Sequence, residues 1–187
     1  MILLVAGVLL FTGTHLYLSL APGAVASLRA RNEGALKGLI SLGVAGGMGL
    51  IIFGWRSAEP SHVYTPNWDL RMPSIGLMVI AIYLLVVAGR PSRVKRVLRH
   101  PQLTGVGLWA IAHLLMNGDS RSVILFGGLL LWVVVSIPMI NRRDGEWQKP
   151  EAPAVVSEVL TLIVSAVVYS ALVWGHQWLA GVPVIMG

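Results

Sequence analysis

Charged residues are confined to short segments of this chain, and between them lie six long runs that carry no charge. All 14 Lys and Arg residues and all 8 Asp and Glu residues fall outside these runs. The runs are Ile2–Leu28, Gly38–Trp55, Met72–Gly89, Pro101–Gly118, Ser122–Asn141 and Val159–Gly187. A helix needs roughly 20 residues, at 1.5 Å each, to cross a hydrocarbon core of about 30 Å. The pattern therefore predicts an all-α polytopic membrane protein, a bundle of about six transmembrane helices that forms one domain over residues 1–187.

The composition agrees with a membrane protein and excludes several kinds of site. Hydrophobic residues make up 56% of the chain and charged residues 12%, about half of the charged fraction of a typical soluble domain. Six uncharged helices could not be buried together in a soluble domain of 187 residues, because such a domain exposes too much of its surface. The chain has no cysteine, which excludes disulfides, thiolate ligands, iron–sulfur clusters and a covalently attached c-type haem.

The basic residues predict an orientation in the membrane. Eleven of the 14 cations lie in three connecting segments, and the other three lie on the opposite side. The cation-rich segments are Ala21–Lys37, Arg90–His100 and Arg142–Glu158. The positive-inside rule places these segments in the cytoplasm and both termini outside. The first run follows no basic n-region and precedes no polar cleavage site, so we interpret it as a span rather than a signal peptide.

Two histidines lie well inside the apolar runs, where an imidazole is unfavourable and indicates a functional site. His113 shares a helix face with Trp109 and Asn117, four residues to either side. A face that carries an indole, an imidazole and an amide is not expected to look at lipid. His15 has Thr12 and Ser19 near its own face, and either hydroxyl could orient a ring nitrogen. The alternative for each histidine is a hydrogen bond between helices that serves packing alone.

Together, the two imidazoles favour a shared metal or cofactor. Neutral imidazole is the usual ligand of haem iron, and a bis-histidine haem takes one ligand from each of two facing helices. Zinc is a weaker interpretation, because a closed zinc site needs four ligands and no carboxylate lies in any run. His15 lies about five residues from the cytoplasmic end of its span and His113 about twelve, so their depths differ by roughly 10 Å. One iron binds both only with a tilted ring or displaced helix ends.

Five segments of the chain resemble those of the NnrU family of bacterial membrane proteins. They are FTGTH (Phe11–His15), ALKGLISL (Ala35–Leu42), RHPQLTGVGLWAIAHLLMNGD (Arg99–Asp119), RRDG (Arg142–Gly145) and HQWLAGVP (His176–Pro183). Their order and spacing extend the resemblance over nearly the whole chain. It implies a bacterial inner-membrane protein linked to the expression or assembly of nitrite and nitric oxide reductases in denitrification.

This family is also similar to the plant 15-cis-zeta-carotene isomerase, a membrane enzyme that holds haem b with two histidines. The resemblance implies noncovalent haem b with His15 and His113 as axial ligands of the iron, and we expect Trp109 and Asn117 to line the same cofactor site. Ala110 stands where the isomerase has a cysteine three residues before its ligand. The resemblance therefore does not extend to a ligand exchange at that thiol.

One motif also resembles a different class of enzyme. RHPQLTG is similar to the RHPxYxG motif of membrane methyltransferases that act on isoprenylcysteine and phospholipids. Leu103 replaces the tyrosine, and no carboxylate-bearing helix follows, since Val159–Gly187 is uncharged. Methyl transfer from S-adenosylmethionine is therefore the weaker alternative.

Three functions stay open from the sequence. The first is a haem-dependent isomerase or redox enzyme that acts on a lipid-soluble substrate, and the second is a non-catalytic assembly factor or sensor in nitrite and nitric oxide metabolism. The third is methyl transfer. Catalytic residues are not assigned. The expected partners are membrane lipids and a lipid-soluble small molecule or nitric oxide; no nucleic acid is expected, and self-association stays open.

Overall fold

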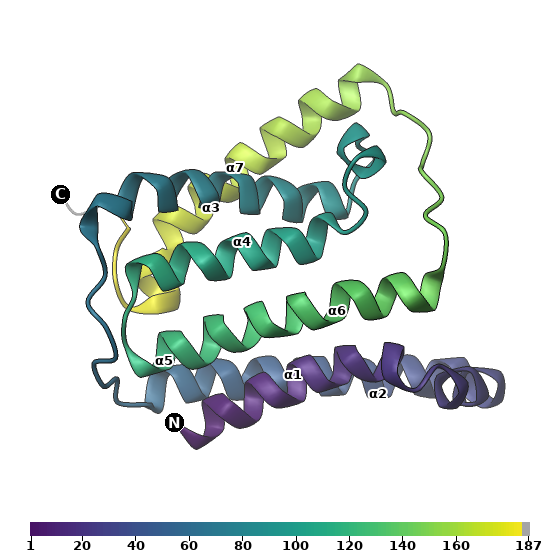
Figure 1. Ribbon diagram of the computed structural model, residues 1–187, viewed down its shortest axis with the longest axis horizontal. Coiled ribbons are helices and arrows are strands. Elements are labelled where there is room, and N and C mark those ends of the chain that lie inside the picture. The colour runs from purple at the N-terminus through teal and green to yellow at the C-terminus, as the bar shows by residue number, and fades with distance from the viewer. Residues whose placement is uncertain (185–187) are drawn as a thin grey trace. The chain divides into compact units, whose positions relative to one another are not determined.

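The computed structural model describes residues 1–184 as a set of helices in two compact units (Figure 1). The first unit comprises Met1–Ser74 and Ala110–Trp147, and the second comprises Ile75–Trp109 and the chain from Gln148 onward. The long helices are α1 (Ile2–Leu20), α2 (Pro22–Ser57), α3 (Arg71–Ala88), α4 (Pro101–Met116), α6 (Gly128–Asp144) and α7 (Val155–Ala180). Short turns are η1 (Trp68–Leu70), η2 (Arg93–Arg96), α5 (Ser120–Ser122) and the π-helix η3 (Val123–Gly127).

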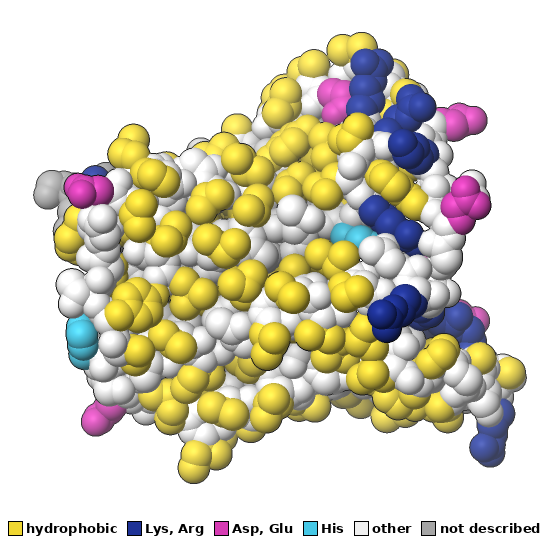
Figure 2. Space-filling view, viewed as in Figure 1, with side chains coloured by type: hydrophobic (Ala, Val, Ile, Leu, Met, Phe, Trp, Pro, Cys, Tyr) yellow, Lys and Arg dark blue, Asp and Glu magenta, His cyan; other side chains and the backbone are white. Residues whose placement is uncertain are grey.

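Each of the six predicted runs contains half or more of a long helix, and the described residues form no strand. The run Ile2–Leu28 is divided at Ala21 between α1 and α2, and the last three residues of Val159–Gly187 lie outside the described residues. The prediction of an all-α membrane bundle is confirmed. Five helical segments are long and apolar enough to cross a membrane, whereas α4, with 16 residues, is shorter than the roughly 20 that a straight span needs. Hydrophobic side chains cover the sides of the helices in the space-filling view (Figure 2), as lipid contact requires. That the whole chain is one domain stays a prediction.

The segment Ala21–Lys37, expected to connect two spans as a loop, is helical. Pro22 occupies the first position of α2, where its missing N–H and fixed φ favour a helix start. The helix is interrupted at Asn32, whose backbone is extended (φ −161°, ψ 95°). The Asn32 side chain accepts a hydrogen bond from the backbone N–H of Ala35 at 2.9 Å and so caps the second part of α2. The prediction of a loop over this segment was wrong, because this cap and Pro22 both favour a helix.

Glycines allow α1 and α2 to pack backbone against backbone in the first unit. A Cβ added at Gly47 would lie 2.7 Å from the backbone nitrogen of Phe11, and one at Gly54 would lie 2.6 Å from the Cα of Leu4. Gly7 makes the reciprocal approach from α1 to α2. Small residues give close helix approach in lipid, where no hydrophobic effect draws helices together. The position of α1, and of the histidine it carries, is therefore fixed by main-chain contacts.

The helix α6 runs parallel to α1 in the same unit. Its first residue, Gly128, lies against Val8, to whose Cγ1 an added Cβ would come within 2.7 Å. Near its other end, Arg143 donates through Nη1 to the hydroxyl of Ser19 at 3.1 Å. Just before α6, η3 has the π-helical hydrogen-bond pattern, which is frequent at functional sites.

Polar contacts hold the second unit together beyond the end of α3. Glu158, in the first turn of α7, accepts from the Ser92 hydroxyl at 3.0 Å and from the backbone N–H of Arg93 at 2.5 Å. Arg90 donates through Nε to the hydroxyl of the fully buried Thr161 at 3.1 Å. These bonds attach the segment with η2 to the start of α7.

Candidate functional site

The imidazole of His15 is half-buried, and its hydrogen bonding fixes its tautomer. Its Nδ1 lies 2.8 Å from the carbonyl oxygen of Phe11, one turn earlier on α1. Because a carbonyl only accepts, Nδ1 carries the proton and Nε2 has a lone pair. The ring also packs against the Phe11 ring, with centroids 4.5 Å apart, and against the Trp132 indole at 5.3 Å. A histidine held in this way presents Nε2 as a metal ligand or hydrogen-bond acceptor.

Trp132, on α6, is the functional candidate that the sequence interpretation missed. It is only 8% exposed, and its ring meets that of Phe11 edge-on with the centroids 5.9 Å apart. Its indole N–H has no hydrogen-bond acceptor among the described residues. A buried donor without an acceptor is unfavourable by about 1–3 kcal/mol. One signal was available, because Trp132 is the eleventh residue of the 20-residue run Ser122–Asn141 and so lies at mid-span.

His113 lies near the end of α4, and its ring is half-buried and stacked on Phe126 of η3. The two ring centroids are 4.4 Å apart and the planes differ by 25°. Phe126 is 4% exposed and also meets the ring of Trp55 of α2 edge-on at 6.1 Å. The π-helix thus supplies the surface against which the second predicted ligand rests.

The two other predicted site residues flank His113 along the chain, Trp109 four residues before it and Asn117 four residues after it. Trp109 lies one turn earlier on α4 and is half-buried. Asn117 follows the last turn, where its amide Nδ2 donates to the carbonyl of His113 at 2.9 Å. This bond attaches the Asn117 amide to the end of α4. One of the two amide N–H groups is therefore used within the protein and is not available to a ligand. Cofactor contact by either residue stays a prediction.

A short strap, defined here as Ser61–Thr65, closes over the end of α4. The hydroxyl of Tyr64 donates toward the carbonyls of Leu114 and Asn117, at 2.9 Å from the latter. The backbone N–H groups of Val63 and Tyr64 donate to the carbonyl of Gly118 at 2.8 and 3.0 Å. Burial, followed by the nearby charge of Asp119, raises the pKa of the Tyr64 phenol. The phenol therefore stays protonated and continues to donate to the helix end that carries His113.

Beside the strap, Asp119 caps the helix that leads into η3. Its carboxylate accepts from the backbone N–H groups of Arg121 and Ser122 and from the Ser122 hydroxyl at 2.6 Å. Burial raises its pKa, but these hydrogen bonds and the charge of Arg121 outweigh that effect and leave the pKa below its usual value. Arg121 in turn lies over the ring of Trp55, 4.8 Å from its centroid. The element carrying Phe126 is thus anchored at its start.

The contacts of the two histidines with η3 and α6 show how far apart their rings lie along the helix axis. His113 rests on Phe126, and His15 rests on Trp132, six residues later. Six helical residues correspond to about 9 Å along the axis. This agrees with the depth difference expected from the sequence, and it shows that the two imidazoles contact the same segment at successive positions.

The side chains around His15 suit a prosthetic group that already supplies most ligands of its metal. They do not suit a bare metal ion. Within residues 1–184, no three His, Asp or Glu side chains lie close enough to hold a metal ion. His15 offers a free Nε2, and the unpaired N–H of Trp132 beside it suits a group that carries acceptor oxygens. Haem b has both an iron that binds imidazole and peripheral carboxylates, and these residues fit it.

The remaining histidines have local roles. His62 pairs with the Thr65 hydroxyl at 3.1 Å within the strap, and His176 pairs through Nδ1 with the carbonyl of Val182 at 2.7 Å. His100 precedes α4 and its carbonyl accepts from the hydroxyl and the backbone N–H of Thr104. The RHPQLTG motif therefore leads into α4 and forms its first turn.

The fold and the site define an all-α membrane protein with two imidazoles set among aromatic rings inside its helices. The chain belongs to the NnrU protein family, whose sequence pattern matches residues 3–184. The resemblance drawn from its sequence segments is thereby confirmed. Comparison with curated proteins gives no match, and comparison with solved structures gives none either.

Proposed function

We propose that this NnrU-family protein holds one noncovalent haem b in the membrane, with His15 and His113 as axial ligands. The observation that carries the proposal is the cluster around His15, where Nδ1 is bonded to a carbonyl and the buried Trp132 donor beside the ring has no acceptor in the described chain. The first feature leaves Nε2 available to a metal, and the second suits a group with acceptor oxygens. The aromatic surfaces of Phe11 and Phe126 suit a flat macrocycle.

The proposed role is that of a redox or gas-binding centre in nitrite and nitric oxide metabolism. Haem supplies one-electron chemistry and an iron that binds diatomic gases. The protein's residues orient the imidazoles through the Phe11 carbonyl and the strap, and the apolar helices exclude bulk water from them. The link to nitrogen oxides rests on the family resemblance. Location in a bacterial inner membrane with both termini outside belongs to the same proposal.

The absorption spectrum of the purified protein tests haem binding. Protein from haem-replete cells is expected to show a Soret band and a b-type pyridine haemochrome. His15→Ala and His113→Ala are each expected to lose bound haem, whereas His176→Ala, at the histidine that pairs with Val182, is expected to keep it. Colourless wild-type protein would overturn the proposal.

A second variant separates loss of a ligand from loss of the fold. His113→Gly leaves room for free imidazole, so added imidazole should restore the Soret band if the side chain acts as a ligand. Failure of imidazole to restore it in a folded variant, with His176→Ala bleached instead, would show that the ligands are assigned wrongly.

The role of the centre is tested separately from its presence. A shift of the Soret band on adding nitric oxide to the reduced protein would support a gas site. Turnover of a polyene without such a shift would instead assign an isomerase. Protection against thermal unfolding by S-adenosylmethionine would assign a methyltransferase.

A further inference from the structure

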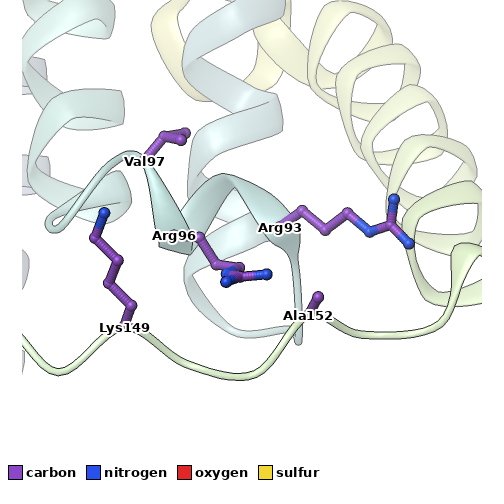
Figure 3. Close-up of a pocket in the computed structure, with 5 residues that line it drawn as sticks. All are labelled: Arg93, Arg96, Val97, Lys149 and Ala152. Carbon is purple, nitrogen blue, oxygen red and sulfur yellow. The ribbon is translucent and has the colours of Figure 1, made fainter.

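A hollow in the second unit is lined by three cations that the proposed haem site does not use. Its volume is about 590 Å³, and its lining residues are Arg93, Arg96, Val97, Lys149 and Ala152. Figure 3 shows Arg93 and Arg96 projecting from η2, and Lys149 from the segment that passes opposite before α7. A volume of this size falls within the range of small-molecule sites, about 300–1,000 Å³.

The local backbone explains why two of these cations face one space. The segment Arg93–Arg96 is a 3₁₀-helix, with three residues per turn, so side chains three apart lie one above the other. Arg93 and Arg96 are three residues apart in the sequence, and the 3₁₀-helix therefore places them on one face. The hydroxyl of Ser92 accepts from the backbone N–H of Val94 at 3.2 Å and caps this turn.

Glu158, an acidic side chain that contacts this turn, is engaged by the turn itself. Glu158 accepts from the Ser92 hydroxyl and from the backbone N–H of Arg93, so its charge stabilises the turn. In the described part of the chain, neither Arg93 nor Arg96 forms an ion pair with a carboxylate. Their positive charge is therefore available to an anion that enters the hollow.

The hollow also has an apolar edge. Val97 directly follows the 3₁₀-helix and is 81% exposed. The hollow lies beyond the end of α3 at Ala88 and before the start of α4 at Pro101. The ends of membrane helices lie at the level of the lipid headgroups. An anion that also carries an apolar part would contact the cations and Val97 together.

We propose that this hollow binds the headgroup of an anionic phospholipid, with Arg93, Arg96 and Lys149 around the phosphate and Val97 against the start of an acyl chain. Arginine and lysine bind phosphate through charge-assisted hydrogen bonds, and basic clusters next to membrane helices bind acidic lipids. Lipid is the ligand because a bilayer surrounds the helices and presents headgroups at this level. The inference is independent of haem binding.

The test is lipid binding by the full-length protein in nanodiscs of phosphatidylcholine with increasing phosphatidylglycerol, followed by native mass spectrometry of retained lipid. The variant Arg96→Gln with Lys149→Gln removes two lining cations. A cation near an anionic surface contributes about fivefold in affinity, so the pair should lower phosphatidylglycerol retention about 30-fold. The control is Arg29→Gln with Arg31→Gln, the same change of charge at exposed positions of α2.

The outcomes separate a built site from general surface charge. Loss of retained lipid in the first variant, with retention kept in the control and haem content unchanged in both, supports the proposal. An equal loss of retained lipid in both variants would show that net charge alone causes the effect, and it would overturn the proposal. Competition by millimolar inorganic phosphate would assign the hollow to a free phosphate instead, and unchanged retention in all variants would also overturn it.

Discussion

Replacing Trp132 by phenylalanine removes one N–H from the His15 cluster and keeps an aromatic ring there. In the protein without a ligand this donor is buried and has no acceptor in the described chain, which is unfavourable by about 1–3 kcal/mol. Its loss offsets the reduced packing against Phe11 and His15, so we expect the stability of the unloaded protein to change by less than about 1 kcal/mol, or about 2–4 °C in Tm. With haem bound, the same N–H would donate to a charged acceptor, an interaction of about 1.5–3 kcal/mol.

Trp132→Phe should therefore weaken haem binding by about tenfold to 150-fold while leaving the unloaded protein intact. The assay is a Soret titration of the unloaded protein with haem, paired with thermal unfolding before haem is added. Trp174→Phe is the control, since that residue is 72% exposed on α7. An unchanged Kd for haem in Trp132→Phe would refute the role of the indole, and a parallel collapse of Tm would show that Trp132 serves packing alone.

Two further predictions concern the scaffold. Gly54→Ala should separate α1 from α2, because the new Cβ would lie 2.6 Å from the Cα of Leu4, and it should lower Tm by several degrees, whereas Gly49→Ala has open space and should leave Tm unchanged. Asp119→Ala removes a helix cap and should destabilise by about 0.5–2 kcal/mol at neutral pH. Because the folded pKa of Asp119 is lowered, its contribution is present above the unfolded pKa and is lost as the pH falls through the folded value. The difference in stability between wild type and variant should therefore narrow as the pH falls from 7 to below the unfolded pKa of Asp119, and a constant difference would contradict this account.

The helices could be predicted from the sequence because the bilayer imposes a simple rule. Backbone groups in hydrocarbon must be satisfied within the segment, so each long uncharged run forms a helix. This rule does not predict the backbone of the segments outside the membrane, where water can also satisfy the backbone groups. The helix across Ala21–Lys37 depends on the cap at Asn32, and the turn at Arg93–Arg96 depends on the Ser92 cap and on Glu158 from a segment distant in sequence. Composition marks such segments as polar but does not select their backbone.

The two histidines of the candidate site could be predicted from the sequence. His15 and His113 stand out because a single imidazole in hydrocarbon is visible in one run of residues. Trp132 and Phe126 do not stand out, because an aromatic ring suits lipid, protein core and cofactor alike. Their importance follows from which helices face each other, and that depends on glycine contacts between helices.

If one iron joins His15 and His113, as we propose, the spacing of their ring contacts along η3 and α6 determines what has to move. The two histidines rest on rings whose positions are about 9 Å apart along the helix axis, whereas metal–imidazole bonds are about 2 Å long. The helix α1 cannot slide easily, because its backbone lies against the glycines of α2, and the end of α4 is held by the strap. The side chains therefore supply the movement. A movement of His113 would break its stack on Phe126, whereas His15 can turn away from the edge-on contact with Trp132 and keep its Nδ1 bond to the Phe11 carbonyl. Ligation would then draw His15 away from Trp132 and expose the indole N–H to the cofactor, so the unpaired donor and the offset histidines are two aspects of one binding event.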